Sequence, residues 1–307
     1  MSRVLVTGGA GFIGSHLVER LEAHGHETVV YDDFSTGRRE NLEGRACEIV
    51  HGDIRDRATL RAALRDVDFV LHYAALASVP ASVADPVGAA GINIEGTALL
   101  LDECRRAEVR RLVFASSSAV YGNATTVLTE NAPLCPVSPY GVHKLTGEHL
   151  CRVSAQGGGP DAVSFRYFNV YGPRQRADSD YAAAIPIFRA RCADGETPTI
   201  YGDGDQTRDF VHVEDVAHAN LLAIERSTPF DGAVLNVARG ESVTIGDLAR
   251  AVMQSYGVSG EPTYAPPRAG DIRRSVSDVS RLRIELDGWS PTIGLAEGLA
   301  SFERSRS

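Results

Sequence analysis

A short apolar run that leads into a glycine-rich turn constrains the fold of this 307-residue chain most strongly. The run covers 3–7 (RVLVT), and the turn covers 8–14 (GGAGFIG). Apolar residues then recur every four positions, at Ile13, Leu17 and Leu21. Apolar β-branched residues indicate a strand, whereas apolar residues four apart indicate a helix. Glycine permits the tight turn between them. We therefore expect the chain to begin with a strand, a glycine turn and a helix.

The same alternation of strand and helix patterns continues through the first half of the chain. Further strands are expected at 27–31, 47–51, 68–73, 112–115 and 162–167, and helices at 56–65, along a stretch through Asn93, Leu99 and Cys104, and from Tyr140 onwards. Strands that alternate with helices form a parallel sheet covered on both faces. The chain is thus predicted to adopt an α/β fold with a doubly wound parallel sheet of the Rossmann type.

The spacing of Gly8, Gly11 and Gly14 is a form of the dinucleotide-binding fingerprint. Glycine lets the backbone approach a pyrophosphate, and the free N–H groups at a helix start favour anions. Phe12 and Ile13, which lie between the last two glycines, are expected to line the same site. The sequence therefore predicts a bound dinucleotide at this turn.

An acidic residue follows the second expected strand, roughly twenty residues after the glycines, where a ribose diol is held. Asp32 is the predicted contact, and its carboxylate would repel a 2′-phosphate. NAD is therefore expected rather than NADP, although Arg38 and Arg39 keep NADP open. Further cofactor contacts are expected where later strands end, and they are Asp53, Ile54, Ala74 and Phe168. Asp53 could hydrogen-bond the adenine amino group, and the small residues after Tyr73 leave room for the dinucleotide.

Lys144 is the only lysine in a chain with 31 lysine and arginine residues. An ammonium is compact and titratable, which a guanidinium is not. Tyr140 lies four residues earlier and follows Pro139, which suits a helix start, so the two side chains share one helix face. A neighbouring ammonium stabilises a phenolate. Tyr140 is thus a candidate general base.

The regular alternation ends after Gly172, and helices are next expected at 213–225, 244–256 and 278–286. We predict an NAD-binding domain over 1–168. Residues 169–307 would form a smaller C-terminal α/β region that mainly binds substrate, with some segments packing back on the first domain.

Composition excludes several classes of partner. The net charge is −9, and no run of Lys or Arg exceeds two residues, which argues against nucleic acid. No apolar run approaches a membrane span. Five cysteines are scattered without metal-ligand spacing, as in a reduced cytoplasmic protein. His212 and His218 have no ligand partners at suitable spacing, so no metal is expected.

Several motifs together resemble the extended short-chain dehydrogenase/reductase family, and within it the nucleotide-sugar 4-epimerases that act on UDP-hexoses. They span nearly the whole chain: TGGAGFIGSHL, YDDFSTG, FASSSAVYG, SPYGVHK, RYFNVYGPRQ, IYGDGDQTRDFVHVEDV and RAGDIRRSVSD. The resemblance implies that Tyr140 takes the proton from a sugar C4 hydroxyl and that Lys144 binds the nicotinamide ribose. It also implies that Ser117 hydrogen-bonds the C4 oxygen, with Ser118 a second candidate.

The resemblance also implies a set of UDP-sugar contacts. Asn169, Arg208 and Arg268 match diphosphate contacts, Tyr201 falls where a ring stacks on uracil, and Asp271 falls where a carboxylate meets the uridine ribose. Ser275 stands where the family borders the hexose C2 substituent. Because serine is small, the expected substrates are UDP-Glc and UDP-Gal, with UDP-GlcNAc and UDP-GalNAc also accepted.

Three alternatives compete with this interpretation. A 4,6-dehydratase would carry Thr-Asp-Glu before VYG, but this chain has Ser117-Ser118-Ala119, so dehydration is set aside. A UDP-glucuronate 4-epimerase or decarboxylase stays open, since Arg174 or Arg176 could meet a carboxylate. The remaining alternative is a non-catalytic NAD-sensing protein, because fold alone does not fix function. Family resemblance further implies a homodimer formed by the helices around 93–106 and from Tyr140.

Overall fold

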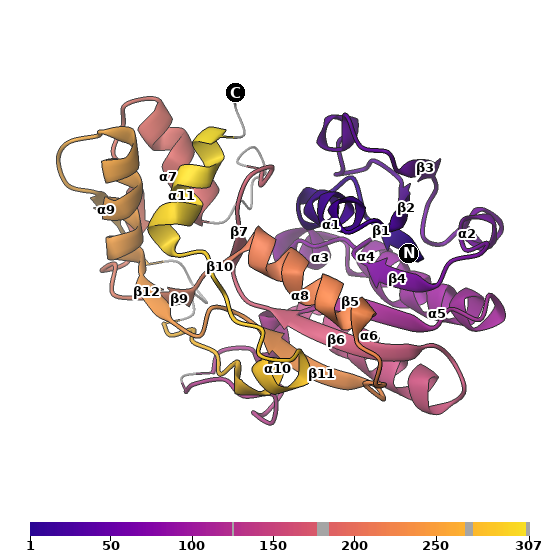
Figure 1. Ribbon diagram of the computed structural model, residues 1–307. Coiled ribbons are helices and arrows are strands. Elements are labelled where there is room, and N and C mark those ends of the chain that lie inside the picture. Colours follow the sequence, from indigo (N-terminus) through magenta and orange to yellow (C-terminus); the bar gives the residue numbers. More distant parts are fainter. Residues whose placement is uncertain (125, 177–183, 268–272, 305–307) are drawn as a thin grey trace.

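A seven-stranded parallel sheet runs through the larger part of the molecule (Figure 1). The computed structural model describes residues 1–124, 126–176, 184–267 and 273–304. All six strand pairs are parallel. In spatial order the strands are β11 (Ala233–Val237), β6 (Asp161–Tyr167), β5 (Arg111–Ser117), β4 (Phe69–His72), β1 (Arg3–Thr7), β2 (Glu27–Asp32) and β3 (Glu48–His51). The expected doubly wound α/β fold is confirmed.

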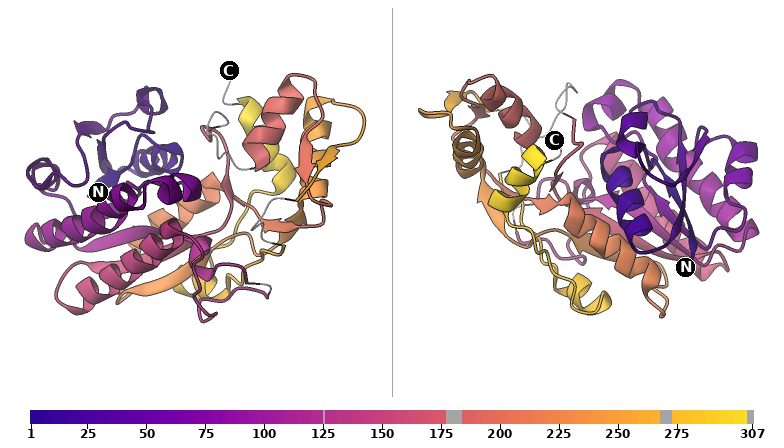
Figure 2. Two further views of the ribbon diagram at one scale, coloured as in Figure 1. Left: turned by 180° about the vertical axis from the view of Figure 1, so that it is seen from behind. Right: turned by 45° about the horizontal axis from the view of Figure 1, so that its top comes forward.

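Helices cover both faces of the sheet because successive strand residues point to opposite sides. On one face Val6 and Val113 pack with Leu17 of α1 and Leu221 of α8. On the other face Leu5 belongs to a second cluster with residues of α2, α5 and α6. Figure 1 shows α8 in front of the sheet, and the left view of Figure 2 shows α5 and α6 on the opposite side. The bounds are α1 (Phe12–Ala23), α8 (Val213–Glu225), α2 (Arg57–Ala63), α5 (Gly96–Arg106) and α6 (Pro139–Gln156).

Short elements complete this part of the chain. Two short helices and a π-helical segment lead into α5; they are α3 (Val79–Ala84), α4 (Pro86–Ala90) and Gly91–Glu95. Single 3₁₀ turns lie at Arg39–Leu42 and Ser118–Tyr121, and α10 (Ser280–Glu285) packs beside β11. The single helix expected through Asn93 is therefore interrupted by a wider turn.

A smaller part of the molecule has its own apolar core. Phe188 of α7, Leu248 of α9 and Phe302 of α11 are buried together there. Small sheets border these helices, with β8 parallel to β13, β9 antiparallel to β12, and β7 parallel to β10. The bounds are α7 (Ala184–Ala193), α9 (Ile245–Tyr256), α11 (Leu295–Arg304), β7 (Val170–Tyr171), β8 (Thr199–Tyr201), β9 (Thr207–Asp209), β10 (Val211–His212), β12 (Ser242–Thr244) and β13 (Thr263–Ala265).

The two halves of the chain are interleaved in space. Helix α8 packs on α1, and β11 extends the sheet beside β6, although both elements lie after residue 169 in the sequence. Figure 2 shows the chain crossing between the two parts more than once. The division of roles between 1–168 and 169–307 stays a prediction.

Capping side chains set several helix boundaries. Helix α2 begins at Arg57 because the Asp56 carboxylate accepts from the Ala58 N–H at 3.0 Å. Helix α9 likewise begins after Thr244, whose hydroxyl accepts from the Asp247 N–H at 3.0 Å. Helix α10 is shorter than the expected 278–286 and begins at Ser280 without a side-chain cap; the Asp278 carboxylate accepts from the Ser280 N–H at 2.7 Å in the turn before it.

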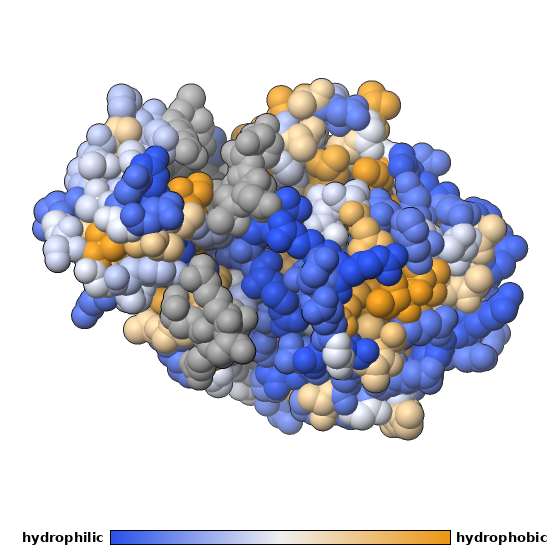
Figure 3. Space-filling view, turned by 90° about the horizontal axis from the view of Figure 1, so that it is seen from above, coloured by the Kyte–Doolittle hydropathy of each residue, from blue (hydrophilic) through white to orange (hydrophobic). Residues whose placement is uncertain are grey.

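The surface is mixed in polarity. Hydrophilic residues cover much of the face in Figure 3, and hydrophobic residues lie in separate patches between them. Within the described ranges, no helix combines the length and the apolar character that crossing a membrane requires.

Candidate active site

A cavity of about 760 Å³ opens at the carboxyl ends of the sheet strands. Residues that follow β1, β2, β4, β5 and β6 line it, together with the start of α6. This edge is where ligands bind in open parallel sheets. The lining includes every predicted cofactor and catalytic residue, namely Gly8, Gly11, Phe12, Ile13, Gly14, Asp32, Asp53, Ile54, Ala74, Ser117, Ser118, Tyr140, Lys144 and Phe168, and also Asn169.

The glycine turn is too tight for a side chain at Gly8 and at Gly14. Gly8 has a φ of +70°, and a Cβ placed on it would lie 2.7 Å from the backbone nitrogen of Ala74. A Cβ on Gly14 would lie 2.2 Å from the carbonyl oxygen of Gly8. No side chain within the described ranges caps the start of α1 at Gly11, so the first N–H groups of the helix are available to an anion. The turn therefore fits a dinucleotide pyrophosphate.

Asp32 lies at the end of β2, and only 6% of it is exposed. Its carboxylate accepts from the N–H groups of Ala10, at 2.9 Å, and Phe34, at 2.8 Å. Burial raises the pKa of this carboxyl group, and the two N–H groups oppose that effect. Backbone donors therefore fix a carboxylate at the cavity wall where the ribose contact was predicted.

Asp53, predicted as an adenine contact, is held by a neighbour. The Nε of Arg55 donates to its Oδ1 at 2.8 Å, and this hydrogen bond lowers the pKa of the carboxyl group. The Asp53 carboxylate therefore stays ionised beside the cavity with one side already occupied by a guanidinium.

Ser117, Tyr140 and Lys144 meet at the centre of the cavity wall. Ser117 ends β5, and the other two lie one turn apart on α6. The Lys144 Nζ donates to the carbonyl oxygen of Ala115 at 2.7 Å and lies 5.8 Å from the centre of the Tyr140 ring. The Ser138 hydroxyl, which accepts from the Gly141 N–H at 3.1 Å, fixes the start of α6. Two rigid elements thus hold the three side chains.

Burial controls the protonation of these groups. It raises the pKa of Tyr140, while a hydrogen bond with Ser117 lowers that pKa. Burial also lowers the pKa of Lys144 to about 8. The sequence led us to expect that the lysine ammonium lowers the tyrosine pKa, but burial raises that pKa. The hydrogen bond with Ser117 opposes the rise.

Three of the predicted substrate residues lie in or contact β9. The Asn169 side chain lines the cavity and donates to the carbonyl oxygen of Asp209 at 2.9 Å. Arg208 precedes Asp209 in β9, and the Ser275 N–H donates to the Thr207 hydroxyl at 3.4 Å. Tyr201 lies in β8 with 40% of its surface exposed. Arg268 and Asp271 lie outside the described residues.

Sequence reasoning missed several cavity-lining residues. Tyr167 ends β6, and Ile92 lies in the π-helical segment. The others come after β2 or β4, and they are Ser35, Thr36, Gly37, Tyr73, Ala75 and Leu76. Asn93 fixes part of this wall, because its Oδ1 accepts from the Leu76 N–H at 2.8 Å. The place after a strand was the available signal, since every strand of a parallel sheet ends at this edge.

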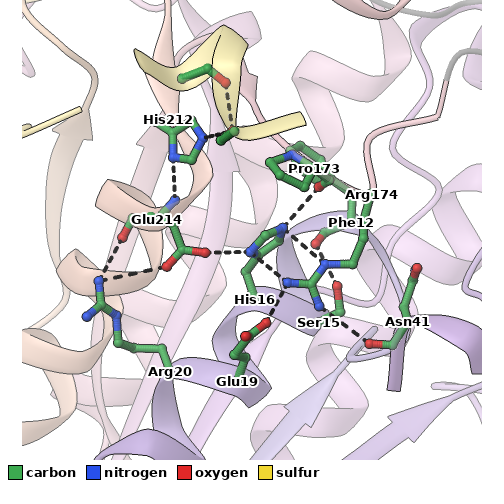
Figure 4. A network of polar contacts seen from close by, with 12 residues as sticks. Phe12, Ser15, His16, Glu19, Arg20, Asn41, Pro173, Arg174, His212 and Glu214 are labelled. Atoms are coloured by element: carbon green, nitrogen blue, oxygen red, sulfur yellow. Dashed lines mark hydrogen bonds and ion pairs between the residues drawn. The ribbon is translucent and has the colours of Figure 1, made fainter. Parts of the chain in front are cut away.

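A polar network joins the glycine-turn helix to the second half of the chain (Figure 4). The buried His16 of α1 contacts Glu214 of α8 through Nδ1 at 2.7 Å. Arg174 lies over His16 and donates to the Glu19 carboxylate at 2.7 Å. Its neighbour Arg176 donates to the Thr36 carbonyl oxygen at 3.3 Å, next to the cavity. The loop after β7 is thereby fastened to the cofactor side of the site.

The model of the NAD dependent epimerase/dehydratase family matches residues 4–238. The chain belongs to this family. A UDP-glucose 4-epimerase of Mycolicibacterium smegmatis is 40% identical over 316 residues, which cover 99% of both chains. The family assignment confirms NAD as the cofactor, and the cavity fits it.

Solved structures of family members superpose closely on the chain. A UDP-N-acetylglucosamine 4-epimerase of Methanobrevibacter ruminantium, in complex with UDP-N-acetylmuramic acid, has a TM-score of 0.92 and 38% identity over 99% of both chains. The UDP-glucose 4-epimerase of Thermus thermophilus, in complex with NAD, has a TM-score of 0.88 and 40% identity over 98% of this chain and 99% of its own. The similarity therefore extends beyond the family model into the C-terminal part.

Proposed function

We propose that this protein interconverts UDP-hexoses that differ in configuration at C4, by way of a transient 4-keto sugar. The observation that carries the proposal is the meeting of Ser117, Tyr140 and Lys144 beside a turn built for a dinucleotide. Family membership and the UDP-sugar 4-epimerases among its relatives support it. The protein is an NAD-dependent enzyme of the isomerase class.

NAD, held by the glycine turn and Asp32, would supply the hydride-transfer chemistry at the sugar C4. Tyr140 takes the proton of the C4 hydroxyl as a general base and gives it back when the alcohol forms again. Ser117 donates a hydrogen bond to the C4 oxygen and to the phenolate in turn, which fits its bond with Tyr140. Lys144, positively charged below its pKa of about 8, stabilises the phenolate and holds the nicotinamide ribose.

The predicted substrate residues would hold UDP while the 4-keto sugar rotates to present its other face. Arg208 and Asn169 lie on neighbouring segments tied through Asp209, so they can contact one diphosphate. Tyr201, with an exposed ring, is placed to stack on the base. Arg268 and Asp271, outside the described residues, complete this proposed set. Residues 169–307 would thus mainly bind substrate, while 1–168 bind NAD.

Ser275 is proposed to set the range of sugars. Its side chain is small and buried, and its backbone is fixed to Thr207 next to Arg208. A small residue beside the hexose C2 leaves space for an N-acetyl group. UDP-GlcNAc and UDP-GalNAc are therefore proposed as substrates alongside UDP-Glc and UDP-Gal.

A homodimer in the cytoplasm is proposed as the working form. Val142 and Val153 lie three turns apart on the outer side of α6, with 46% and 63% of their surfaces exposed. Val87 of the adjacent α4 is 81% exposed. These valines offer an apolar surface for a second copy. All five cysteines lack a disulfide, which supports a reducing compartment.

The test is to incubate the purified protein separately with UDP-Glc, UDP-GlcNAc and UDP-glucuronate, without added NAD, and to separate the products beside 4-epimer standards. We expect conversion of UDP-Glc and UDP-GlcNAc with NAD that stays bound between turnovers. A preference for UDP-glucuronate would favour the glucuronate enzymes. No conversion of any substrate, even with NAD supplied, would contradict the proposal and favour an NAD-sensing role.

Two variants test the mechanism. Tyr140→Phe should lower kcat by about 10²- to 10⁴-fold, the usual contribution of a general base, because it removes only the hydroxyl group. Tyr264→Phe, on the exposed β13, is the matched control and should keep full activity. A Tyr140→Phe enzyme with normal kcat would remove Tyr140 from the mechanism.

A further inference from the structure

An ion pair lies buried behind the catalytic side chains. Glu148 of α6 and Arg166 of β6 are each 3% exposed. The Arg166 Nε donates to the Glu148 Oε1 and a terminal nitrogen donates to Oε2, both at 2.8 Å. Such a two-pronged pair fixes both the distance and the relative orientation of its elements.

The pair reaches every element that carries a proposed catalytic group. The Ser116 hydroxyl, one residue before Ser117, donates to Glu148 Oε1 at 2.5 Å. Arg166 also donates to the Tyr121 hydroxyl at 2.9 Å, in the turn that follows Ser117 and Ser118. Tyr121 in turn donates to the Asn236 Oδ1 of β11 at 2.6 Å. One connected network therefore joins β5, β6, β11, α6 and the serine turn.

Glu148 lies on the same face of α6 as the proposed base. Tyr140, Lys144 and Glu148 are spaced four residues apart, so their side chains follow one line along the helix. Lys144 and Glu148 are buried and Tyr140 is half-buried, because this line faces the sheet and ends at the cavity. A displacement of Glu148 would therefore turn or slide Tyr140 relative to Ser117.

We propose that the Glu148–Arg166 pair is a positioning pair that sets the contact between Tyr140 on α6 and Ser117 on β5. This inference rests on the proposed function, in which these two residues act on the C4 oxygen. Neither partner of the pair lines the cavity. The two residues act through the elements that they join, and they are not catalytic residues.

Physical chemistry favours a positioning role over a purely stabilising one. Bringing two charges out of water costs free energy, so a buried ion pair contributes little net stability compared with apolar packing. Its directional hydrogen bonds define a geometry that apolar packing would leave looser. A small displacement matters, since a misplacement of about 1 Å can lower a rate roughly 100-fold.

A second ion pair, which also involves an arginine and strand β6, provides a matched control. Arg111 and Asp161 face each other where β5 and β6 begin, at the edge of the sheet away from the cavity. The Arg111 Nε donates to Asp161 Oδ2 at 2.6 Å, and only 5% of the arginine is exposed. Arg111 also donates to the carbonyl oxygens of Ala223 and Arg226. Both pairs therefore contain a buried arginine and involve β6, but the Arg111–Asp161 pair lies away from the catalytic end of the sheet.

The experiment compares Glu148→Gln with Asp161→Asn in the NAD-bound enzyme. Each change keeps the side-chain shape and leaves a buried arginine beside a neutral amide. We expect Glu148→Gln to lower kcat roughly 10- to 100-fold with little change in KM. Asp161→Asn should lower the thermal stability about as much as Glu148→Gln does, but it should leave kcat unchanged. Ser116→Ala, which removes one contact of Glu148, should give a smaller loss of kcat.

A spectroscopic measurement separates this inference from the proposed function. The absorbance change of tyrosinate, titrated with and without Tyr140→Phe in each background, reports the ionisation of Tyr140 and needs no substrate. Glu148→Gln should move that ionisation to higher pH, because it weakens the Ser117 contact, whereas Asp161→Asn should not.

The outcomes are distinct. Equal effects of Glu148→Gln and Asp161→Asn on stability, with unchanged kcat and unchanged Tyr140 ionisation, would overturn the positioning role. If Glu148→Gln fails to fold, normal kcat and normal Tyr140 ionisation in Ser116→Ala would overturn it as well. A wild-type enzyme without turnover would instead contradict the proposed function, while the titration would still decide whether Glu148 positions Tyr140.

Discussion

At the scale of single residues, the sole lysine is the most informative. Lys144 is 5% exposed, and its ammonium donates to a backbone carbonyl oxygen. Burial lowers its pKa to about 8, from an ordinary value of about 10.4. An arginine there would carry a longer, planar group that cannot titrate. Lysine is therefore the cationic residue that can be buried at this position and still lose its proton near pH 8.

The lowered pKa of Lys144 predicts a pH-dependent stability. Between about pH 8 and pH 10 the unfolded chain holds this proton more tightly than the folded protein does. Stability contributed by this residue must then rise with pH. The free energy of unfolding of wild type minus that of Lys144→Met should increase by on the order of 3 kcal/mol over this window, as measured by urea unfolding. A difference that is flat or falls with pH would contradict the lowered pKa.

Residue-level prediction from the sequence succeeded where geometry follows from local spacing. Gly8 and Gly14 in one turn, and Tyr140 and Lys144 one helical turn apart, needed no knowledge of the tertiary structure. Arg166 and its partner Glu148 were missed. They lie 18 residues apart on different elements, and only the packing of α6 on β6 brings them together.

At the scale of elements, the glycine turn and α1 act as one unit. Gly14→Ala is expected to force apart the backbone of Gly8 and the first turn of α1, because the added Cβ would lie 2.2 Å from the Gly8 oxygen. The variant should purify with less NAD and unfold at a lower temperature, as measured by absorbance after release of NAD and by calorimetry. Overpacking of this kind costs about 1–3 kcal/mol.

Gly294→Ala is the control for this change. It lies ahead of α11, where a Cβ would meet no atom within 4 Å. Its stability and NAD content should match those of wild type. Normal NAD content in Gly14→Ala would show that the turn tolerates a side chain.

Element types were predicted well from the sequence, and element ends less well. The apolar periods identified the strands of the large sheet except β11, and they identified α1, α2, α5, α6, α8, α9 and α10, but α7 and α11 were not predicted. Capping by Asp56 and Thr244 moved the starts of α2 and α9. The π-helical segment around Asn93 gave no local signal. The Asn93 side chain accepts a hydrogen bond from the Leu76 N–H, 17 residues earlier, and this contact depends on the tertiary structure.

At the scale of the whole molecule, the order of the strands exceeded what periodicity can predict. The strand at 233–237 was not predicted, and nothing in its sequence specifies β6 as its neighbour. That choice depends on α8 crossing the sheet beside α1. Long-range order of this kind follows from packing of complete elements.

The proposed homodimer yields a prediction at the same scale. Val142→Glu introduces a charge on the exposed side of α6, so desolvation should oppose association. The variant should elute as a monomer in light-scattering chromatography, while wild type elutes as a dimer. Val127→Glu, at a valine that is 56% exposed in a loop, is the control and should leave the mass unchanged. If Val142→Glu is still a dimer, the interface does not include this side of α6.

The late position of β11 has a consequence for biosynthesis. This strand pairs with β6 from Val163 to Tyr167, yet about 65 residues separate the two strands in the sequence. During synthesis at roughly 5–20 residues per second, β6 waits several seconds with an unpaired edge. An open edge can pair with another nascent chain. A chaperone that shields this edge should therefore raise the yield of the full-length protein more than changes at its C-terminal helices do.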